Sequence, residues 1–327
     1  MAERPASSPE QFLVPSAPAG CDVSSQHLDV QFPGVKRPLK FPNDPKGRAA
    51  ILKKIRETRA DILVLESTGI YGLALATEAC EAGIPVALVN PSRVRDHARS
   101  RGQLHKNDAA DAVAITEFAR GATLRLWTLP DENRREIRAL SDRLTQIARM
   151  RGAEMNRRKI VRDDGVLLDI EEHLRHLDQR TAAIQARLDE IIGGDPQLAR
   201  VAEVIQSMKG AGPATVRIMI AHLPQLGVAG NRTCSALAGL APFDDDSGQK
   251  RGTRHIRGGR CEVRNQLYLC AICCIRHVPK IRAYYDGLCG RMSKKEALVP
   301  IMRKILWTLG AMIRTDTLWI EHHQLAA

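Results

Sequence analysis

Aromatic residues, regularly spaced cysteines and long apolar runs are scarce in this sequence of 327 residues. Phe, Trp and Tyr make up 4% of it, which argues against the broad base-stacking surfaces that bind single-stranded nucleic acid. The eight cysteines lack the dense, regular spacing of a secreted disulfide scaffold. Residues 1–19 lack the pattern of a signal peptide, and the apolar stretch of residues 297–313 is interrupted by Arg303 and Lys304. We therefore expect a reduced, soluble, cytoplasmic protein without a membrane partner.

Basic residues outnumber acidic ones. The chain has 49 Lys and Arg against 37 Asp and Glu, a formal net charge of +12 with a pI near 9.6. Such an excess favours a polyanionic partner, and nucleic acid is the first candidate. Because aromatic side chains are few, contact between arginines and the phosphate backbone is favoured over stacking. The length is sufficient for two domains, each with its own core.

Residues 105–120 (HKNDAADAVAITEFAR) predict an amphipathic helix, since good helix formers fill the segment and Gly121 is the first breaker after it. Asp108 and Asp111 are three residues apart and so project from the same helix face. Two carboxylates on one face repel each other, and solvent, a basic partner or a divalent cation relieves that cost. Taken alone, the pair is more simply explained by a solvated helix start, where the helix dipole favours acidic residues.

Two further carboxylates lie at predicted strand ends. Residues 20–32 suggest two short strands around a polar turn at residues 24–26, with Asp22 on or just after the first strand. The apolar run that ends at Glu66 is typical of a strand buried on both faces, and open α/β sheets place their sites at such strand ends. Another buried strand is predicted at residues 84–90, followed by a basic loop at residues 93–106. A structural role is the simpler explanation for any one of these acids alone.

Together, however, the acids form a pattern. Four carboxylates from two strand ends and one helix are candidates for a single site: Asp22, Glu66, Asp108 and Asp111. Carboxylates that converge at a sheet edge can hold two divalent ions, which activate an attacking oxygen and stabilise a leaving one during phosphodiester cleavage. Ligands that are all oxygen favour Mg²⁺ or Mn²⁺ over zinc.

The middle of the chain is helical. Residues 131–195 predict two long antiparallel helices that turn near residues 163–165. A solvated hairpin explains most of the acidic residues, although ten Arg or Lys between residues 134 and 162 suggest an arm that contacts nucleic acid or a second protomer. Residues 207–220 (SMKGAGPATVRIMI) suggest a helix-hairpin-helix segment, in which Gly210 and Gly212 allow a tight turn before a phosphate-binding helix start. An ordinary interhelical turn explains them equally well.

A run of cations follows. Residues 249–264 contain six basic residues with interleaved glycines, and predict a flexible loop that binds phosphates: Lys250, Arg251, Arg254, Arg257, Arg260 and Arg264. Ser247 precedes them in an Asp-Ser-Gly sequence, where a serine is usually a turn residue. Four potential zinc ligands lie in the apolar segment after the loop, but they lack a second ligand pair at zinc spacing and predict core packing instead: Cys270, Cys273, Cys274 and His277.

Several segments resemble a known family. GCDVSSQHLDV, LVLESTGIYG and KNDAADA are similar to the RuvC-like (RNase H-like) domain of the DEDD-type insertion-sequence transposases, which include bridge-RNA-guided serine recombinases. The region around Ser247, with EVRNQLYLCAICCIRHVPKIRAYYDGL and KKEALVPIMRKILWTLGAMIR, resembles their C-terminal transposase domain. The resemblance covers nearly everything from Gly20 to Arg314, and Asn107 departs from it where the family more often has Thr.

The resemblance implies a fold and a function. The expected fold is α/β plus all-α: a disordered leader at 1–18, a RuvC-like domain at 19–130, a helical hairpin or coiled-coil arm at 131–195 and a helical transposase domain at 196–327. The four carboxylates would be the metal ligands and Ser247 the nucleophile. The expected partners are double-stranded DNA at the element ends and target, a non-coding bridge RNA, and further protomers in a dimer or tetramer associated with the bacterial nucleoid.

Two alternatives stay open at this point. The first is a metal-dependent nuclease of the junction-resolving kind, in which water attacks and Ser247 only binds phosphate. The second is a nucleic-acid-binding protein without catalytic activity, whose carboxylates are structural. A covalent protein–DNA adduct separates the recombinase from the nuclease, because a neutral serine needs activation before it attacks.

Overall fold

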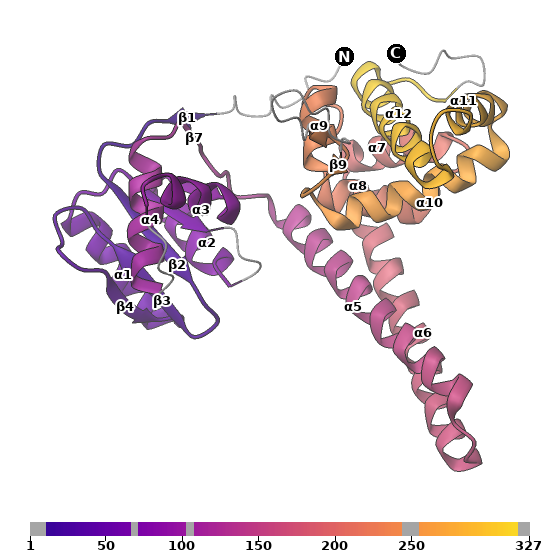
Figure 1. Cartoon of the computed structure of the whole chain (residues 1–327). Coiled ribbons are helices and arrows are strands. Elements are labelled where there is room, and N and C mark those ends of the chain that lie inside the picture. The colour runs from indigo at the N-terminus through magenta and orange to yellow at the C-terminus, as the bar shows by residue number, and fades with distance from the viewer. Residues whose placement is uncertain (1–10, 67–70, 103–107, 244–254, 320–327) are drawn as a thin grey trace. The chain divides into compact units, whose positions relative to one another are not determined.

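The computed structural model describes residues 11–66, 71–102, 108–243 and 255–319, with the backbone alone at residues 108–110 (Figure 1). The chain divides into two compact units, Met1–Pro130 and Asp131–Ala327. Within the described ranges, every helix is too short or too polar to cross a membrane.

The N-terminal unit contains a five-stranded sheet in the order β4-β3-β2-β5-β6. β2, β5 and β6 run parallel to one another, and β3 and β4 are antiparallel to their neighbours. The strands span Pro18–Val23 (β2), His27–Gln31 (β3), Leu39–Pro42 (β4), Ile62–Glu66 (β5) and Val86–Val89 (β6). Two strands therefore flank the polar turn at residues 24–26 and Glu66 ends a buried strand, as the sequence predicted.

Helices cover both faces of this sheet. α1 (Pro45–Glu57) and α2 (Leu73–Glu81) enclose one core with alternate strand residues that include Cys21 and Leu65. α3 (Pro91–Ser100) and α4 (Asp108–Arg120) enclose the other core with the intervening strand residues, among them Val64. α3 and α4 lie side by side (Figure 1). Side chains alternate between the faces of a strand, so Asp22 and Glu66 belong to the face that α3 and α4 cover.

The basic loop predicted at residues 93–106 is wrong for its first half, because residues 91–100 form α3. The Asn90 side chain caps this helix by accepting the Ser92 N–H at 2.8 Å, and Pro91 occupies its first position. Both are standard helix-start signals. Val94 is buried, and Phe118 of α4 packs against His97 with 5.8 Å between ring centroids. The three arginines of this segment favoured the interpretation as a basic loop, and the packed face was not predicted.

The disordered leader predicted at residues 1–18 is wrong for residues 11–18, and residues 1–10 lie outside the described part. β1 (Phe12–Leu13) pairs with β7 (Leu124–Arg125). The Asp61 carboxylate accepts the backbone N–H groups of Ser16 and Ala17 at 2.6 and 2.9 Å. These hydrogen bonds stabilise an ordered conformation of the segment, which its proline-rich composition did not predict.

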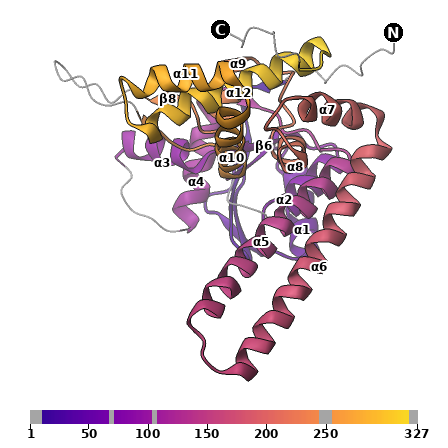
Figure 2. The same ribbon diagram turned by 90° about the vertical axis from the view of Figure 1, so that its right-hand side faces the viewer.

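The second unit begins with the predicted helical hairpin. α5 (Glu132–Ile160) and α6 (Asp164–Gly194) run alongside each other (Figure 2). α6 buries residues at successive steps of four, three, seven, four and three, which fit the heptad spacing of a coiled coil: Ile170, Leu174, Leu177, Ile184, Leu188 and Ile191. On α5 the buried Glu154 interrupts the apolar seam and accepts from Arg157 at 2.6 Å.

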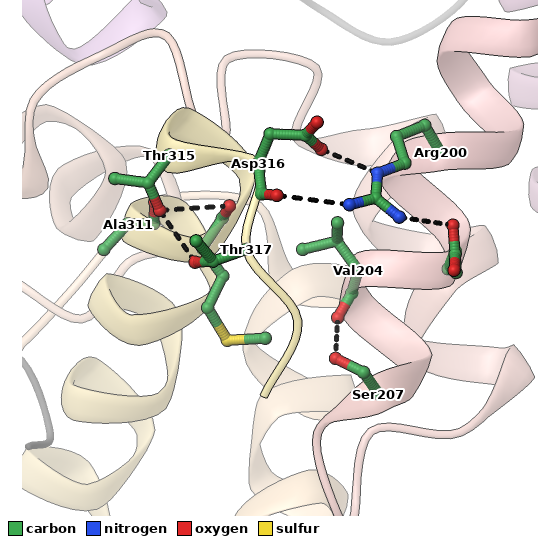
Figure 3. Close-up of polar contacts among 9 residues, drawn as sticks. Arg200, Val204, Ser207, Ala311, Thr315, Asp316 and Thr317 are labelled. Carbon is green, nitrogen blue, oxygen red and sulfur yellow. Dashed lines mark hydrogen bonds and ion pairs between the residues drawn. The ribbon is translucent and has the colours of Figure 1, made fainter. Parts of the chain in front are cut away.

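The unit continues with α7 (Pro196–Ser207), α8 (Pro213–His222), α9 (Asn231–Leu237), α10 (Cys261–His277), α11 (Pro279–Cys289) and α12 (Lys294–Thr315), and with a short pair of strands, β8 (Pro242–Phe243) and β9 (His255–Ile256). α12 packs against α7, α9, α10 and α11, whereas α8 packs against α5, α7 and α10. The end of α12 is bound to α7: Arg200 Nε donates to Asp316 Oδ1 at 2.7 Å and Nη2 donates to the Asp316 carbonyl at 3.1 Å (Figure 3).

The predicted core packing of the cysteines in α10 is confirmed for two of them. Cys270 and Cys274 are buried with their sulfur atoms 3.8 Å apart, and Cys274 donates to the Lys209 carbonyl at 3.2 Å. Cys273 and His277 are exposed. The hydrogen bond with Cys274 and then burial raise the pKa of the Cys270 thiol, so it stays protonated and packs as a small apolar group.

Candidate functional site

A row of charged residues crosses the sheet of the N-terminal unit. Lys40 pairs with Asp29 across β4 and β3, and Asp29 pairs with Asp22 across β3 and β2. Cys21 pairs with Leu65, so one step further Asp22 stands beside Glu66 on β5. Directly paired residues project from the same face. Three carboxylates therefore occupy neighbouring positions on the face that α4 covers.

The direction of α4 decides which of its ends meets this row. Gly20 lies against the helix: its N–H donates to Thr116 Oγ1 at 3.1 Å, and Thr116 Oγ1 donates to the Ala112 carbonyl at 2.9 Å. A Cβ on Gly20 would overlap both Thr116 and the Ala112 carbonyl. Only glycine lets the helix backbone approach β2 this closely.

The last turn of α4 lies beyond the beginning of β2. Arg120 lines a cavity of about 230 Å³ together with Gln31 and Lys36, and Gln31 pairs with Gly20 near the start of β2. α4 therefore runs antiparallel to β2, and its first turn is directed toward the strand end that carries Asp22. The backbone positions of Asp108 and Asp111 belong to this first turn.

Metal binding by the four carboxylates stays a prediction. The side chains that the structure describes include no group of three or more His, Cys, Asp or Glu residues arranged to hold a metal ion. The Asp108 side chain lies outside the described part. The donors themselves fit a hard divalent cation, because all are carboxylate oxygens. Asp22, Glu66 and Asp111 are half-buried, so such a cation would be partly shielded from water.

Asp29 is the residue in this row that the sequence reasoning missed. It is 9% exposed, and its Oδ2 lies 3.9 Å from Lys40 Nζ. A signal was present: Asp29 stands between Leu28 and Val30, which are both fully buried on the opposite face. Strict alternation therefore directs Asp29 to the same face as Asp22, where its negative charge adds to the field at that carboxylate.

In the second unit, β8 and β9 form the neck of a hairpin. Phe243 pairs with His255 and Pro242 with Ile256, so the hairpin encloses residues 244–254. Those residues lie outside the described part of the chain. They include four of the predicted site residues: Ser247, Lys250, Arg251 and Arg254. Their proposed roles stay predictions.

The other three predicted cations lie after β9, and each has a partner within the protein. Arg257 Cζ lies 4.7 Å from the centroid of the Phe243 ring. Arg260 donates to the His222 carbonyl, and Arg264 donates to the Gly258 carbonyl. Phosphate binding by these three residues also stays a prediction, but each already contributes to the local structure.

The turn between α7 and α8 has the predicted glycines in different roles. Gly210 has a φ of +96°, and a Cβ there would overlap Cys274 of α10, so both its conformation and its packing require glycine. Gly212 begins α8 with a φ of −82° and open space around it, so the turn itself does not require glycine there. Phosphate binding at this turn remains untested.

A buried polar pair joins α5 of the helical hairpin to α8. His222 of α8 is fully buried, and its Nε2 lies 2.9 Å from the Ser141 hydroxyl of α5. Burial, and then the positive charge of Arg138, lower the pKa of His222 to about 4, against the opposing influence of Asp142. The imidazole is therefore neutral near pH 7.

Comparison with known proteins assigns the chain to a class. A family model for the DEDD transposases of IS110, described as Transposase, matches residues 19–161. A second, described as Transposase IS116/IS110/IS902 family, matches residues 202–286. Both units thus carry matches to transposases, which are DNA-rearranging enzymes. The chain belongs to the IS110 family of transposases.

Individual relatives agree with this class. The chain is 24% identical to the pilin gene-inverting protein of Moraxella bovis over 259 residues, which cover 78% of this chain and 80% of that protein. It is 26% identical to the transposase for insertion sequence element IS1111A of Coxiella burnetii over 264 residues, 69% of this chain and 71% of that one. It is also 26% identical, over 165 residues, to the IS110 uncharacterized 43.6 kDa protein of Streptomyces coelicolor, covering 48% of this chain and 38% of that protein.

Proposed function

We propose that this transposase is a serine recombinase that cuts and rejoins double-stranded DNA, with a RuvC-like N-terminal unit that binds two Mg²⁺ or Mn²⁺ ions. Ser247 would be the nucleophile, and four carboxylates would hold the metal ions: Asp22, Glu66, Asp108 and Asp111. When bound, such ions lower the pKa of an attacking hydroxyl and neutralise charge on the leaving oxygen.

The observation that carries the proposal is the close approach of α4 to β2 at Gly20. Without it, acidic residues 86 or more positions apart in the chain would have no reason to meet, since Asp22 and Asp108 belong to separate elements. The hydrogen bond from Gly20 to Thr116 fixes the helix against the strand. The parallel register of β2 and β5 then supplies Glu66 as the neighbour of Asp22.

The proposed chemistry proceeds in two transesterifications. Ser247 Oγ loses its proton to solvent and attacks a DNA phosphorus atom, and the bond from phosphorus to one DNA oxygen breaks. The strand end carrying that oxygen leaves as a hydroxyl, and the other end stays joined to the protein as a phosphoserine. A hydroxyl of the recipient strand then attacks the same phosphorus and regenerates Ser247. Each step exchanges one phosphoester for another, so the DNA is rejoined without an external energy source.

The proposed partners follow from charge and from the relatives. A net charge of +12 suits a nucleic acid duplex, and the name of the Moraxella relative states that it inverts a pilin gene, which requires rejoining as well as cutting. We further propose a non-coding bridge RNA as guide and a homo-oligomer as the synaptic form, with the serine and the carboxylates supplied by different protomers.

Replacement of Ser247 with Ala tests the nucleophile. Strand cleavage should vanish, together with any protein–DNA adduct that survives a denaturing gel, while DNA binding changes little because one hydroxyl contributes little to affinity. Ser247→Cys is the chemical control, since a thiolate is nucleophilic but has different geometry. If Ser247→Ala still cuts DNA with Mg²⁺ and leaves free ends, water is the nucleophile and the protein is a junction-resolving type of nuclease. If the wild-type protein binds DNA but neither cuts nor links to it, a non-catalytic role is correct.

A further inference from the structure

Arg260, four residues after β9, is bound to two other parts of the second unit. Its backbone N–H donates to the Leu237 carbonyl at the end of α9 at 2.8 Å. Its Nη1 donates to the His222 carbonyl at the end of α8 and to Gln225 Oε1, both at 2.7 Å. Both hydrogens of this nitrogen are thereby used within the protein. Arg260 is half-buried, and its guanidinium connects the segment after β9 to the end of α8.

Arg264 and two glycines close the neck from the other side. Arg264 Nη1 donates to the Gly258 carbonyl at 2.7 Å and lies 3.5 Å from the Gly239 carbonyl. Gly239 precedes β8, Gly259 follows β9, and both have positive φ. A Cβ on Gly259 would overlap the Gly239 backbone. The segments that enter and leave the hairpin are therefore held side by side at a distance that excludes other residues.

These contacts lead away from the expected role in phosphate binding. Arg260 directs both hydrogens of Nη1 at two neutral acceptors inside the unit, so these two of its five N–H donors cannot contact a phosphate. We propose that Arg260 and Arg264 are positioning residues: they fix the neck formed by β8 and β9, and the rate of the reaction proposed at Ser247 depends on that neck. This inference rests on the proposed role of Ser247 as nucleophile.

A double-mutant cycle on Arg260 and Gln225 tests the inference. Gln225 is uncharged, so Gln225→Met removes the acceptor of Arg260 Nη1 without changing the charge of the protein. The single-turnover rate constant for adduct formation at saturating DNA should fall roughly 10- to 100-fold in Arg260→Ala, because small displacements of a reacting group have large effects on rate. Gln225→Met should lower it in the same direction, and the double variant should lose little more.

Binding measurements separate positioning from phosphate contact. If Arg260 positions the hairpin, the Kd for DNA and the slope of log K against log salt stay close to wild-type values. If Arg260 binds a phosphate, the slope falls by about 0.9 and Gln225→Met has no effect, which would overturn the inference. A general loss of folded protein would lower the amplitude of the single turnover and leave its rate constant unchanged, and this result also contradicts positioning.

Arg200 provides a matched control in the same unit. Like Arg260, it donates to a backbone carbonyl and to a side-chain oxygen, but its partner is Asp316 at the end of α12 (Figure 3). Arg200→Ala should leave the adduct rate constant unchanged. Gln225→Met and Arg260→Lys carry the test if Arg260→Ala does not fold. Failure of the serine proposal is distinct, because the wild-type protein would then form no adduct to measure.

Discussion

At the scale of single residues, the electrostatic environment of each carboxylate in the sheet depends on the charges of the residues beside it. Asp29, Asp22 and Glu66 occupy adjacent positions across three strands, so each carboxylate is in the field of the next one. Like charges this close repel unless a cation lies between or beside them. Lys40 offers one positive charge at the end of the row, 3.9 Å from Asp29.

We expect Glu66→Gln to abolish DNA cleavage without loss of the fold. The amide keeps the volume of the side chain but removes a negative charge from a row of like charges, so the free energy of unfolding without metal should be unchanged or higher. Cleavage of supercoiled plasmid in Mg²⁺ and the midpoint of thermal unfolding measure the two effects. Glu57→Gln, in an exposed pair with Lys54, is the matched control. Full cleavage by Glu66→Gln would exclude Glu66 from the site.

His222 gives the second unit a defined response to pH. Its pKa is lowered to about 4 in the folded protein from 6.5, so the unfolded chain takes up a proton first as pH falls. Stability is therefore full above pH 6.5 and decreases between pH 6.5 and 4, by about 3 kcal/mol in total. Thermal unfolding across this range should show a steeper loss for wild type than for His222→Asn, which cannot titrate. Parallel pH profiles would mean that the pKa of His222 is the same in the folded and the unfolded protein.

At the scale of elements, close backbone approach is the decisive feature. α4 touches β2 through Gly20, and the turn before α8 touches α10 through Gly210. Helix propensity and hydrophobic pattern predict that these elements exist, but the absence of a Cβ determines how near they come to one another.

Gly20→Ala tests whether α4 must touch β2. The new Cβ would overlap Thr116 and the Ala112 carbonyl, so α4 must move outward at a cost of about 1–3 kcal/mol. The first turn of the helix moves with it, and cleavage should fall further than the stability loss alone explains. Gly121→Ala, where the nearest atom is 4.0 Å from the added Cβ, is the control. An active Gly20→Ala protein of normal stability would show that the approach is dispensable.

At the scale of the whole molecule, the excess of 12 positive charges makes nucleic-acid binding a matter of ionic strength. Release of counterions from DNA makes binding fall as salt rises, with a slope set by the number of phosphates that the protein neutralises. The cations of residues 249–264 divide in this respect. Arg260 and Arg264 hydrogen-bond to acceptors within the protein, and phosphate binding stays a prediction for all six.

Neutralising Arg251, Arg254 and Arg257 together should weaken binding to DNA and RNA across sequences. On duplex DNA, the slope of log K against log salt should become shallower by about 0.9 for each phosphate that the variant no longer neutralises. Filter binding at several salt concentrations measures it. A matched variant that neutralises the exposed Lys46, Lys53 and Arg56 of α1 removes the same charge elsewhere and reports the general effect of net charge. An unchanged slope in the first variant would mean that its three residues do not touch phosphates.

The sequence by itself determined the elements and most of the candidate residues. Period and composition were sufficient for the strands that carry Asp22 and Glu66, for the helix that begins at Asp108 and for the long hairpin, because each depends on local pattern. Local pattern was also sufficient for the burial of Cys270. The helix at residues 91–100 was missed because its arginines were interpreted as a basic loop, although Asn90 and Pro91 are local helix-start signals.

Tertiary structure alone decided which residues meet. Register across β4, β3, β2 and β5 placed Asp29 in the row of carboxylates, and the contact at Gly20 holds α4 against β2. The hydrogen bonds of Arg260 inside the unit also depend on tertiary structure, because its acceptors lie 35 and 38 residues earlier in the chain. A residue's neighbours in sequence cannot specify partners at such separations, since these depend on how whole elements pack.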